Sequence, residues 1–155
     1  MYTCTFFKIE ELVSKDIYNQ AKKKGLVDKL WLAFDARLLR ALDALRKHFG
    51  PLTVNTWVFG GGYTESGLRT FGTSTGAYLS QHKFGRAFDF RSKQHSPKEI
   101  YEDMLACGGT KAGFVSADTH WQGITRLEYY PGITWTHVDV SDAGNADGSM
   151  RVFRG

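Results

Sequence analysis

The stretch that most constrains the fold is residues 80–89, which read Ser-Gln-His-Lys-Phe-Gly-Arg-Ala-Phe-Asp. It places a histidine, His82, seven positions before a carboxylate, Asp89. In a strand entered from a loop, Asp89 points to one side while Phe88 and Phe90 point to the other, because side chains alternate along a strand. A carboxylate beside a hydrophobic layer needs an ionic, hydrogen-bonding or metal partner. We therefore expect Asp89 to be paired.

A shared metal ion is one such partner, with His137 as a third ligand. His137 lies in residues 135–140, Trp-Thr-His-Val-Asp-Val, which alternate like a strand. Two histidines and one carboxylate, with a fourth position left for water, form the ligand set of a catalytic zinc site. The alternative is a plain hydrogen bond between His82 and Asp89 that stabilises the start of the strand.

The length of 155 residues predicts one domain, 1–155, with a helical N-terminal part at about residues 6–50 and a site-bearing sheet at about residues 52–155. The net charge of +4 favours weak attraction to anionic polymers, such as nucleic acid or bacterial cell wall, without choosing between them. We expect no nucleic-acid partner, because no aromatic or helix-turn-helix pattern accompanies the charge.

Cys4 and Cys107 lack the paired spacing of a zinc ribbon or redox motif, so we expect isolated thiols, with a disulfide as the alternative. No apolar run approaches the length of about 20 residues that spans a bilayer, and the first residues do not resemble a secretory signal. We expect a monomer made in the cytoplasm. A target outside a membrane then requires delivery by something else.

Hydrophobic periodicity predicts helices in the first third of the chain. Residues 6–24 indicate one or two short helices, and residues 28–49 predict one amphipathic helix that ends before Pro51. Residues 52–59 alternate and predict the first strand. The glycine- and threonine-rich connection at residues 60–79 is long enough to suggest a functional loop that walls the site.

Later signals predict a helix and a hairpin. Ser96 begins a capping box, and its helix is expected to reach about Cys107. From residue 113 the chain looks extended, with a Pro-Gly turn at residues 131–132. Taking those two residues as the loop places Glu128 opposite Trp135 and Arg126 opposite His137, on one face with Asp139.

Two motifs together resemble a known family. Ser80-x-His82-x-x-Gly85-x-Ala87-x-Asp89, followed by Trp135-x-His137-x-Asp139, is similar to the zinc D-Ala-D-Ala carboxypeptidases and phage endolysins, whose fold is shared by the hedgehog signalling domain. The chain looks closest to small phage-encoded members, which implies delivery to the cell wall by phage lysis or by virion components. Ser66-Gly67-Leu68-Arg69 also resembles the family segment that carries a substrate-binding arginine. The resemblance implies an α+β fold, with a small antiparallel sheet and helices packed on one face.

The resemblance also implies roles for individual residues. The zinc ligands would be His82, Asp89 and His137; Glu128 would be the general base; Arg69 and Ser80 would bind substrate; and Asp139 would orient a histidine. Family members often place the catalytic glutamate only a few residues before the last histidine, whereas Glu128 is nine before it. Either the hairpin compensates, or Glu128 is structural.

The expected function is zinc-dependent hydrolysis of a peptide bond in bacterial peptidoglycan, in a D-amino-acid-containing stem peptide or cross-link. Zn²⁺ would lower the pKa of its bound water, and Glu128 would move the proton to the leaving amine. The alternative is a non-catalytic phage tail or virion module, or a wall-binding module, that keeps the fold and the zinc site.

Overall fold

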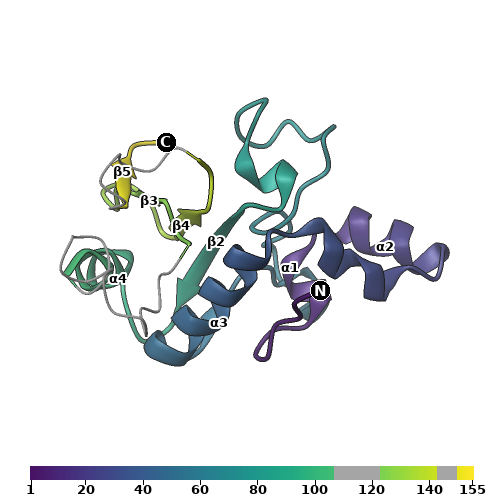
Figure 1. The fold of residues 1–155 in the computed structure, drawn as a ribbon, viewed down its shortest axis with the longest axis horizontal. Helices are drawn as coiled ribbons and strands as arrows, with labels where there is room; N and C mark the ends of the chain where they lie inside the picture. Colours follow the sequence, from purple (N-terminus) through teal and green to yellow (C-terminus); the bar gives the residue numbers. More distant parts are fainter. Residues whose placement is uncertain (107–122, 143–149) are drawn as a thin grey trace.

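The computed structural model describes residues 1–106, 123–142 and 150–155 (Figure 1). It confirms a mixed α+β architecture with one five-stranded sheet among the described residues. The α-helices are α1 (Ile9–Leu12), α2 (Lys15–Lys23), α3 (Ala36–Phe49) and α4 (Pro97–Met104), and the 3-10 helices are η1 (Val27–Ala33), η2 (Trp57–Phe59) and η3 (Gln81–Phe84). The strands are β1 (Leu52–Thr53), β2 (Ala87–Ser92), β3 (Arg126–Glu128), β4 (Thr136–Asp139) and β5 (Arg151–Phe153).

The helices of the first third confirm one prediction and correct another. Two short helices occupy the segment where one or two were expected. The single helix expected over residues 28–49 is instead divided into η1 and α3. The reason is Asp35, whose carboxylate caps α3 by accepting from the backbone N–H of Arg37, while its own backbone N–H donates to Gly85. That second bond joins the start of α3 to the segment that carries His82.

The sheet has the strand order β1-β2-β4-β3-β5. Neighbouring strands are antiparallel except for the last pair, β3 and β5, which run parallel. The expectation of a purely antiparallel sheet is therefore wrong at this edge. The chain returns to the sheet at Met150 and adds Arg151 beside Arg126 in the same direction, so that the predicted edge strand at Val152 and Phe153 forms, but with parallel pairing.

The first predicted strand is much shorter than expected. Only Leu52 and Thr53 pair with β2, and the expected strand over residues 52–59 gives way to η2. Hydrogen bonds to the N-terminal helices explain the change: the backbone N–H of Asn55 donates to Glu11, and its side-chain amide donates to the carbonyl of Val13. These contacts draw the chain away from the sheet after two residues.

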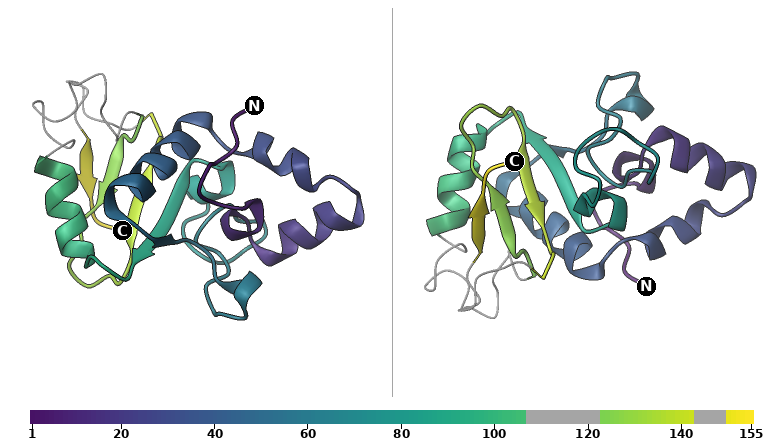
Figure 2. Two further views of the ribbon diagram at one scale, coloured as in Figure 1. Left: turned by 90° about the horizontal axis from the view of Figure 1, so that it is seen from below. Right: turned by 90° about the horizontal axis from the view of Figure 1, so that it is seen from above.

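The hydrophobic core packs residues of the sheet against residues of α1, α3 and α4. In Figure 1, α3 and α4 lie below the strands, while the connection at residues 60–79 rises above them. The right-hand view of Figure 2 looks onto the sheet from the side of this connection. Phe88 and Phe90 are fully buried on the helix side, as the alternation along β2 predicts. Asp89, between them, faces the opposite side, where its carboxylate accepts a hydrogen bond from Arg69 of the connection.

Other predictions have mixed outcomes. The capping box at Ser96 is confirmed: its hydroxyl accepts from the backbone of Glu99, and the Glu99 carboxylate accepts from the backbone of Ser96. Cys107 lies outside the described residues, as does the expected extended segment from residue 113 to residue 122, so the thiol state stays a prediction. Within the described ranges, no helix is both long enough and apolar enough to cross a membrane.

Candidate metal centre

His82 is fixed by a backbone carbonyl behind it. It lies in η3, is 2% exposed, and its Nδ1 atom is 2.9 Å from the carbonyl oxygen of Gly67. A carbonyl only accepts hydrogen bonds, so Nδ1 carries the proton and Nε2 is left with a lone pair that could bind a metal ion. The Gly67 carbonyl is held in turn, because backbone bonds join its neighbour Leu68 to Leu12 and Ser14 at the end of α1.

Gly85 ends η3 and redirects the chain into β2. Its φ angle is +65°, in the left-handed region that favours glycine, and its backbone N–H closes the turn on Gln81 and His82. A Cβ atom at this position would lie 2.0 Å from the carbonyl oxygen of Ala33. Glycine therefore allows both the turn and the close packing of η3 against η1.

Asp89 presents a different oxygen to each side. Oδ2 accepts from Arg69 Nη2 at 2.9 Å, while Oδ1 lies 2.7 Å from His137 Nδ1 and 3.3 Å from His82 Nε2. Burial raises the pKa of Asp89, but the hydrogen bonds with His137 and His82 outweigh it and hold this pKa well below its usual range. Asp89 is therefore a carboxylate at neutral pH and offers a charged oxygen to the centre.

His137 faces Asp89 across the β2–β4 pair, where the two residues are register partners. Its Nε2 atom is 3.3 Å from Asp139 Oδ2, and its Nδ1 atom points at Asp89. Burial lowers the pKa of His137, but hydrogen bonds with Asp139 and Asp89 outweigh it and raise this pKa to about 9. Without a metal, protonated His137 thus bridges the two carboxylates. A metal ion would replace its Nδ1 proton.

The three expected ligand residues converge as a zinc site requires. His82, Asp89 and His137 each offer an atom within 4.8 Å of the others. Ligand atoms about 2.0–2.1 Å from a tetrahedral zinc ion are about 3.3 Å apart. The His82 Nε2 to His137 Nδ1 and His82 Nε2 to Asp89 Oδ1 separations are both 3.3 Å. Only the 2.7 Å between His137 and Asp89 would have to widen, so these residues fit the ion.

Asp139 is held by more than His137. It is fully buried, and the side chain of Arg126 approaches its Oδ2 from Nη2 at 2.6 Å and from Nε at 2.8 Å. The backbone N–H and hydroxyl of Ser141 donate to its other oxygen at 3.1 and 2.8 Å. Burial raises the pKa of Asp139, but these bonds and the one from His137 lower it well below its usual range. Asp139 therefore fixes the orientation of the His137 ring.

Glu128 lies at the end of β3, in a register two residues from the expected one. Arg126 pairs with Asp139, and Leu127 with Val138, so continuing the ladder brings Glu128 opposite His137. The expected pairs of Glu128 with Trp135 and of Arg126 with His137 are therefore wrong. A shift of two residues keeps every side chain on its expected face, so Glu128 still shares a face with His137.

The connection between β3 and β4 explains the shift. The Pro-Gly pair forms a turn closed by the backbone N–H of Ile133 and the carbonyl of Tyr130, and Gly132 has a φ of +88°. This geometry does not match the twist of two paired strands, so it is disfavoured as a two-residue hairpin loop. Residues 129–135 all belong to the connection. The backbone N–H of Tyr129 donates to the carbonyl of Phe153 in β5.

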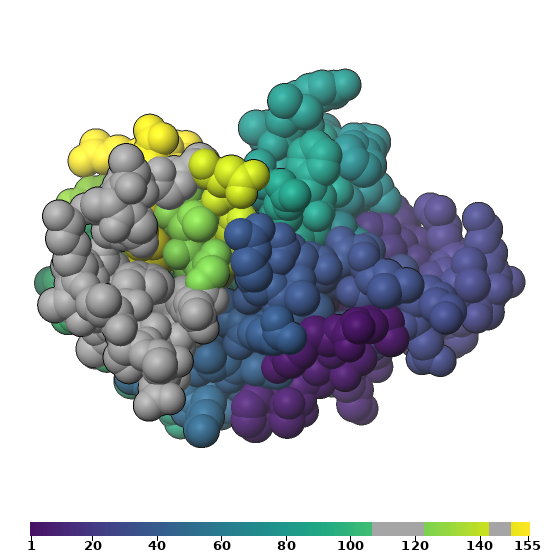
Figure 3. All heavy atoms as spheres, in the orientation of Figure 1, coloured from purple at the N-terminus to yellow at the C-terminus, as the bar shows by residue number. Residues whose placement is uncertain are grey.

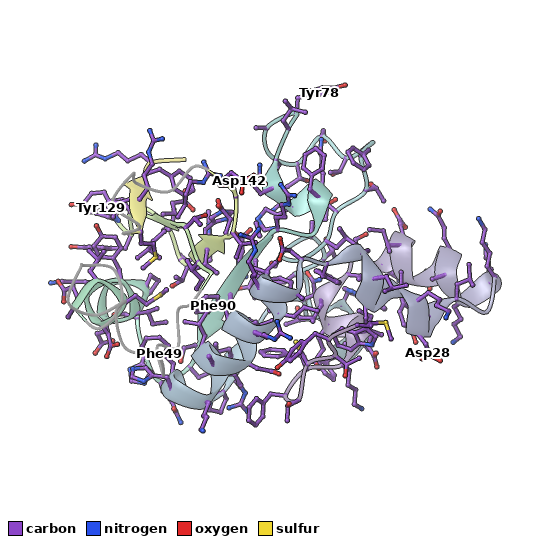
Figure 4. The ribbon with its side chains drawn as sticks, viewed as in Figure 1. Asp28, Phe49, Tyr78, Phe90, Tyr129 and Asp142 are labelled. Carbon is purple, nitrogen blue, oxygen red and sulfur yellow. The ribbon has the colours of Figure 1, made fainter. Side chains whose placement is uncertain are left out.

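An open cleft of about 450 Å³ lies over the centre. The three ligand residues line it, together with Arg69, Ser80, Arg126, Glu128 and Trp135. The connection at residues 60–79 forms one wall, as expected, and stands up as a separate lobe in Figure 3. Tyr78 lies at its tip and is 86% exposed (Figure 4).

Arg69 and Ser80, the two residues expected to bind substrate, differ in their contacts and burial. Arg69 is 8% exposed, bonded through Nη2 to Asp89 and through Nε to the carbonyl of Glu65. Its guanidinium therefore holds a ligand residue in place. Ser80 is half-buried at the N-terminus of η3 and presents its side chain to the cleft.

Sequence reasoning assigned no role to Arg126, Gly67 or Trp135. Trp135 donates from Nε1 to Glu128 Oε2 at 3.2 Å. The shared face of Arg126 and Asp139 was a usable signal, because opposite charges on facing strands pair. The Gly67 carbonyl had no such signal, since its contact with His82 depends on how the long connection folds.

No protein-family model, curated protein or solved structure matches the chain.

Proposed function

We propose that this protein is a zinc-dependent peptidase that hydrolyses peptide bonds of bacterial peptidoglycan. The observation that carries the proposal is the convergence of His82 Nε2, Asp89 Oδ1 and His137 Nδ1 beneath an open cleft. The substrate class and the hedgehog or D-Ala-D-Ala-peptidase fold come from the motif resemblance, and the α+β sheet is compatible with both.

The ligand set supports a catalytic ion more than a structural one. Three protein ligands leave a coordination position free, whereas structural zinc is enclosed by four. Zinc bound there would supply a Lewis acid that acidifies water and polarises the scissile carbonyl. The Gly67 carbonyl and the Asp139 carboxylate fix the two imidazole rings so that each ligand nitrogen points inward.

Glu128 is the proposed general base. It lines the cleft, and the continued β3–β4 register places it opposite His137, although it is nine residues away in sequence. The Trp135 indole holds one of its oxygens and leaves the other to accept a proton from the attacking water and pass it to the leaving amine. Ser80 and the remaining N–H groups of Arg69 line the same cleft and would donate hydrogen bonds to the substrate.

The test combines metal analysis with digestion of purified peptidoglycan. We expect one zinc ion per chain and metal-dependent release of peptide products. Glu128→Gln should keep the zinc and lose activity by at least about a hundredfold, because general-base catalysis contributes about 10²–10⁴-fold. Glu102→Gln, on the exposed face of α4, is the matched control and should remain active.

A second candidate is a non-catalytic wall-binding or virion module that keeps the zinc. The hydrogen bond between Trp135 and Glu128 favours it, because a carboxylate held by the indole can also have a purely structural role. In that case the protein would bind zinc and peptidoglycan but release no product, and Glu128→Gln would behave like wild type in binding. Product release by the wild type would exclude it.

A further inference from the structure

A second cavity of about 310 Å³ adjoins the metal cleft and contains an arginine with no acidic partner among the described residues. Arg69, Asp89 and Trp135 line both spaces, so the two cavities adjoin at these residues. Arg91 lines the second cavity but not the metal cleft. It follows Asp89 by two positions in β2 and therefore points to the same side of the sheet.

The Arg91 guanidinium lies over the ring of Tyr63, with the ring of Trp135 farther away. Its Cζ atom lies 3.6 Å from the ring centre of Tyr63 and 5.9 Å from that of Trp135. One nitrogen, Nη1, donates to the Ser66 hydroxyl at 3.3 Å. The Nε atom is buried without a hydrogen-bond partner. Because Nε is enclosed by protein, a ligand in the cavity would bind through the Nη1 and Nη2 end of the guanidinium.

The other charges in this cavity already have partners. Asp89 is bonded to Arg69 and the two histidines, and Glu65 accepts a hydrogen bond from the Thr75 hydroxyl. Burial raises the pKa of Glu65, but hydrogen bonds from threonines and the charge of Arg69 lower it below its usual range. Glu65 is thus an anion engaged elsewhere, and Arg91 is the cation still able to bind one.

We propose that Arg91 anchors a carboxylate of the peptide substrate, in a subsite that lies beside the metal centre across Asp89. This inference rests on the proposed function and specifies its substrate: a peptide with a free carboxylate close to the scissile bond. A planar guanidinium offers two parallel N–H groups to a carboxylate, and stacking on aromatic rings fixes its plane. The carboxylate is either the C-terminal one or that of an acidic residue within the peptide.

Three synthetic peptides distinguish these sources: a D-alanyl-D-alanine peptide with a free C-terminus, its C-terminal amide, and the same amide carrying an internal D-glutamate. Their dissociation constants are measured by calorimetry on the Glu128→Gln protein, which should not turn them over. A charge-assisted hydrogen bond contributes enough for about a tenfold or greater change in affinity. If the C-terminal carboxylate is the anchored group, amidation should weaken binding by about tenfold or more and the internal D-glutamate should not restore it. If an internal acidic residue is the anchored group, the acid and the amide should bind alike and the D-glutamate peptide should bind about tenfold or more tightly.

The variant Arg91→Lys keeps the charge but loses the planar fork. It should weaken binding of the carboxylate peptide by a similar factor and leave binding of the amide unchanged, so that the two changes are not additive. The control is Arg46→Lys, an arginine that also stacks on an aromatic ring, Phe6, but lines neither cavity. Melting temperature and zinc content verify folding, and the comparison of the three peptides does not depend on any substitution of Arg91.

Equal affinity for all three peptides, or equal weakening of acid and amide by Arg91→Lys, would overturn the anchor. Hydrolysis is measured separately, with the zinc-loaded wild type. If the wild type hydrolyses all three peptides equally well and binds them alike, the proposed function stands and the anchor fails. If it hydrolyses no peptide and no peptidoglycan while the affinity difference persists, the anchor stands and the peptidase proposal fails.

Discussion

Arg69 donates from Nη2 to Oδ2 of Asp89 at 2.9 Å, and both side chains are nearly buried. This bond leaves Oδ1 of Asp89 directed at His82 and His137. The arginine lies in the connection at residues 60–79, which has no regular helix or strand. The bond therefore joins this connection, which forms one wall of the cleft, to strand β2. Arg69 therefore positions Asp89 in the candidate metal centre.

The first prediction concerns this bond. Arg69→Gln should weaken zinc binding by about 10- to 100-fold, the usual effect of losing a hydrogen-bonding partner of a metal ligand. The affinity is measured by competition with a chelator of known zinc affinity. Arg46→Gln removes a surface arginine that stacks on Phe6 and should leave the affinity unchanged. Equal affinity of Arg69→Gln and wild type would show that Asp89 needs no such support.

The second prediction is a graded pair of substitutions at the carboxylate behind His137. Asp139→Asn removes the charge that pairs with Arg126 and should lower zinc affinity by about 10- to 100-fold. It should also lower the free energy of unfolding of the metal-free protein by about 3 kcal/mol, since it leaves a partly buried cation without its partner.

Ser141→Ala removes only the hydroxyl bond to Asp139 and is the milder member of the pair. It should cost about 1 kcal/mol and change zinc affinity less than Asp139→Asn does. Urea denaturation with EDTA present gives the first quantity and chelator competition gives the second. The reverse order of effects would contradict the role assigned to Asp139.

How far the sequence predicted this site depends on the range of the interactions involved. Alternation along one strand predicted that Phe88 and Phe90 face the core and that Asp89 faces away from it. This was correct because strand geometry is local. The faces of Glu128 and His137 were also correct, since a two-residue shift of register preserves them.

The errors arose where distant segments compete for the backbone. The helix expected over residues 28–49 breaks at Asp35 because the chain there bonds to Gly85, fifty residues later. The first strand stops after Thr53 because Asn55 bonds to the α1 region instead. Similarly, the Arg69–Asp89 bond requires the whole connection to be folded. Such contacts leave no periodic signal in the sequence.

The third prediction is that Gly85→Ala destabilises the protein by about 2 kcal/mol or more. The position has a φ of +65°, and the added methyl group would lie 2.0 Å from the carbonyl oxygen of Ala33. Thermal unfolding with and without zinc measures the effect. Gly132→Ala is the matched control, because it also has a positive φ, +88°, but open space around it, and it should cost only the backbone strain. Equal losses for the two variants would rule out the clash with η1.

The fourth prediction concerns Asp35 and the pH dependence of stability. The hydrogen bonds with Arg37 lower the pKa of Asp35 in the folded protein below its usual value. A group whose pKa is depressed by folding stabilises the native state above its unfolded pKa of about 4, and this contribution disappears as the pH falls through the folded pKa. The cap of α3 should therefore weaken in acid.

Asp35→Ala should lower the free energy of unfolding by about 1 kcal/mol at pH 7, as the loss of an N-cap does. The difference from wild type should shrink at pH 3, since the wild-type carboxyl group is then increasingly protonated. Urea denaturation of both proteins in EDTA at the two pH values measures it, and groups that titrate alike in both proteins cancel. Asn also caps helices but does not titrate, so the difference between Asp35→Asn and Asp35→Ala should not change with pH. A wild-type advantage over Asp35→Ala that grows in acid would contradict the ionised cap.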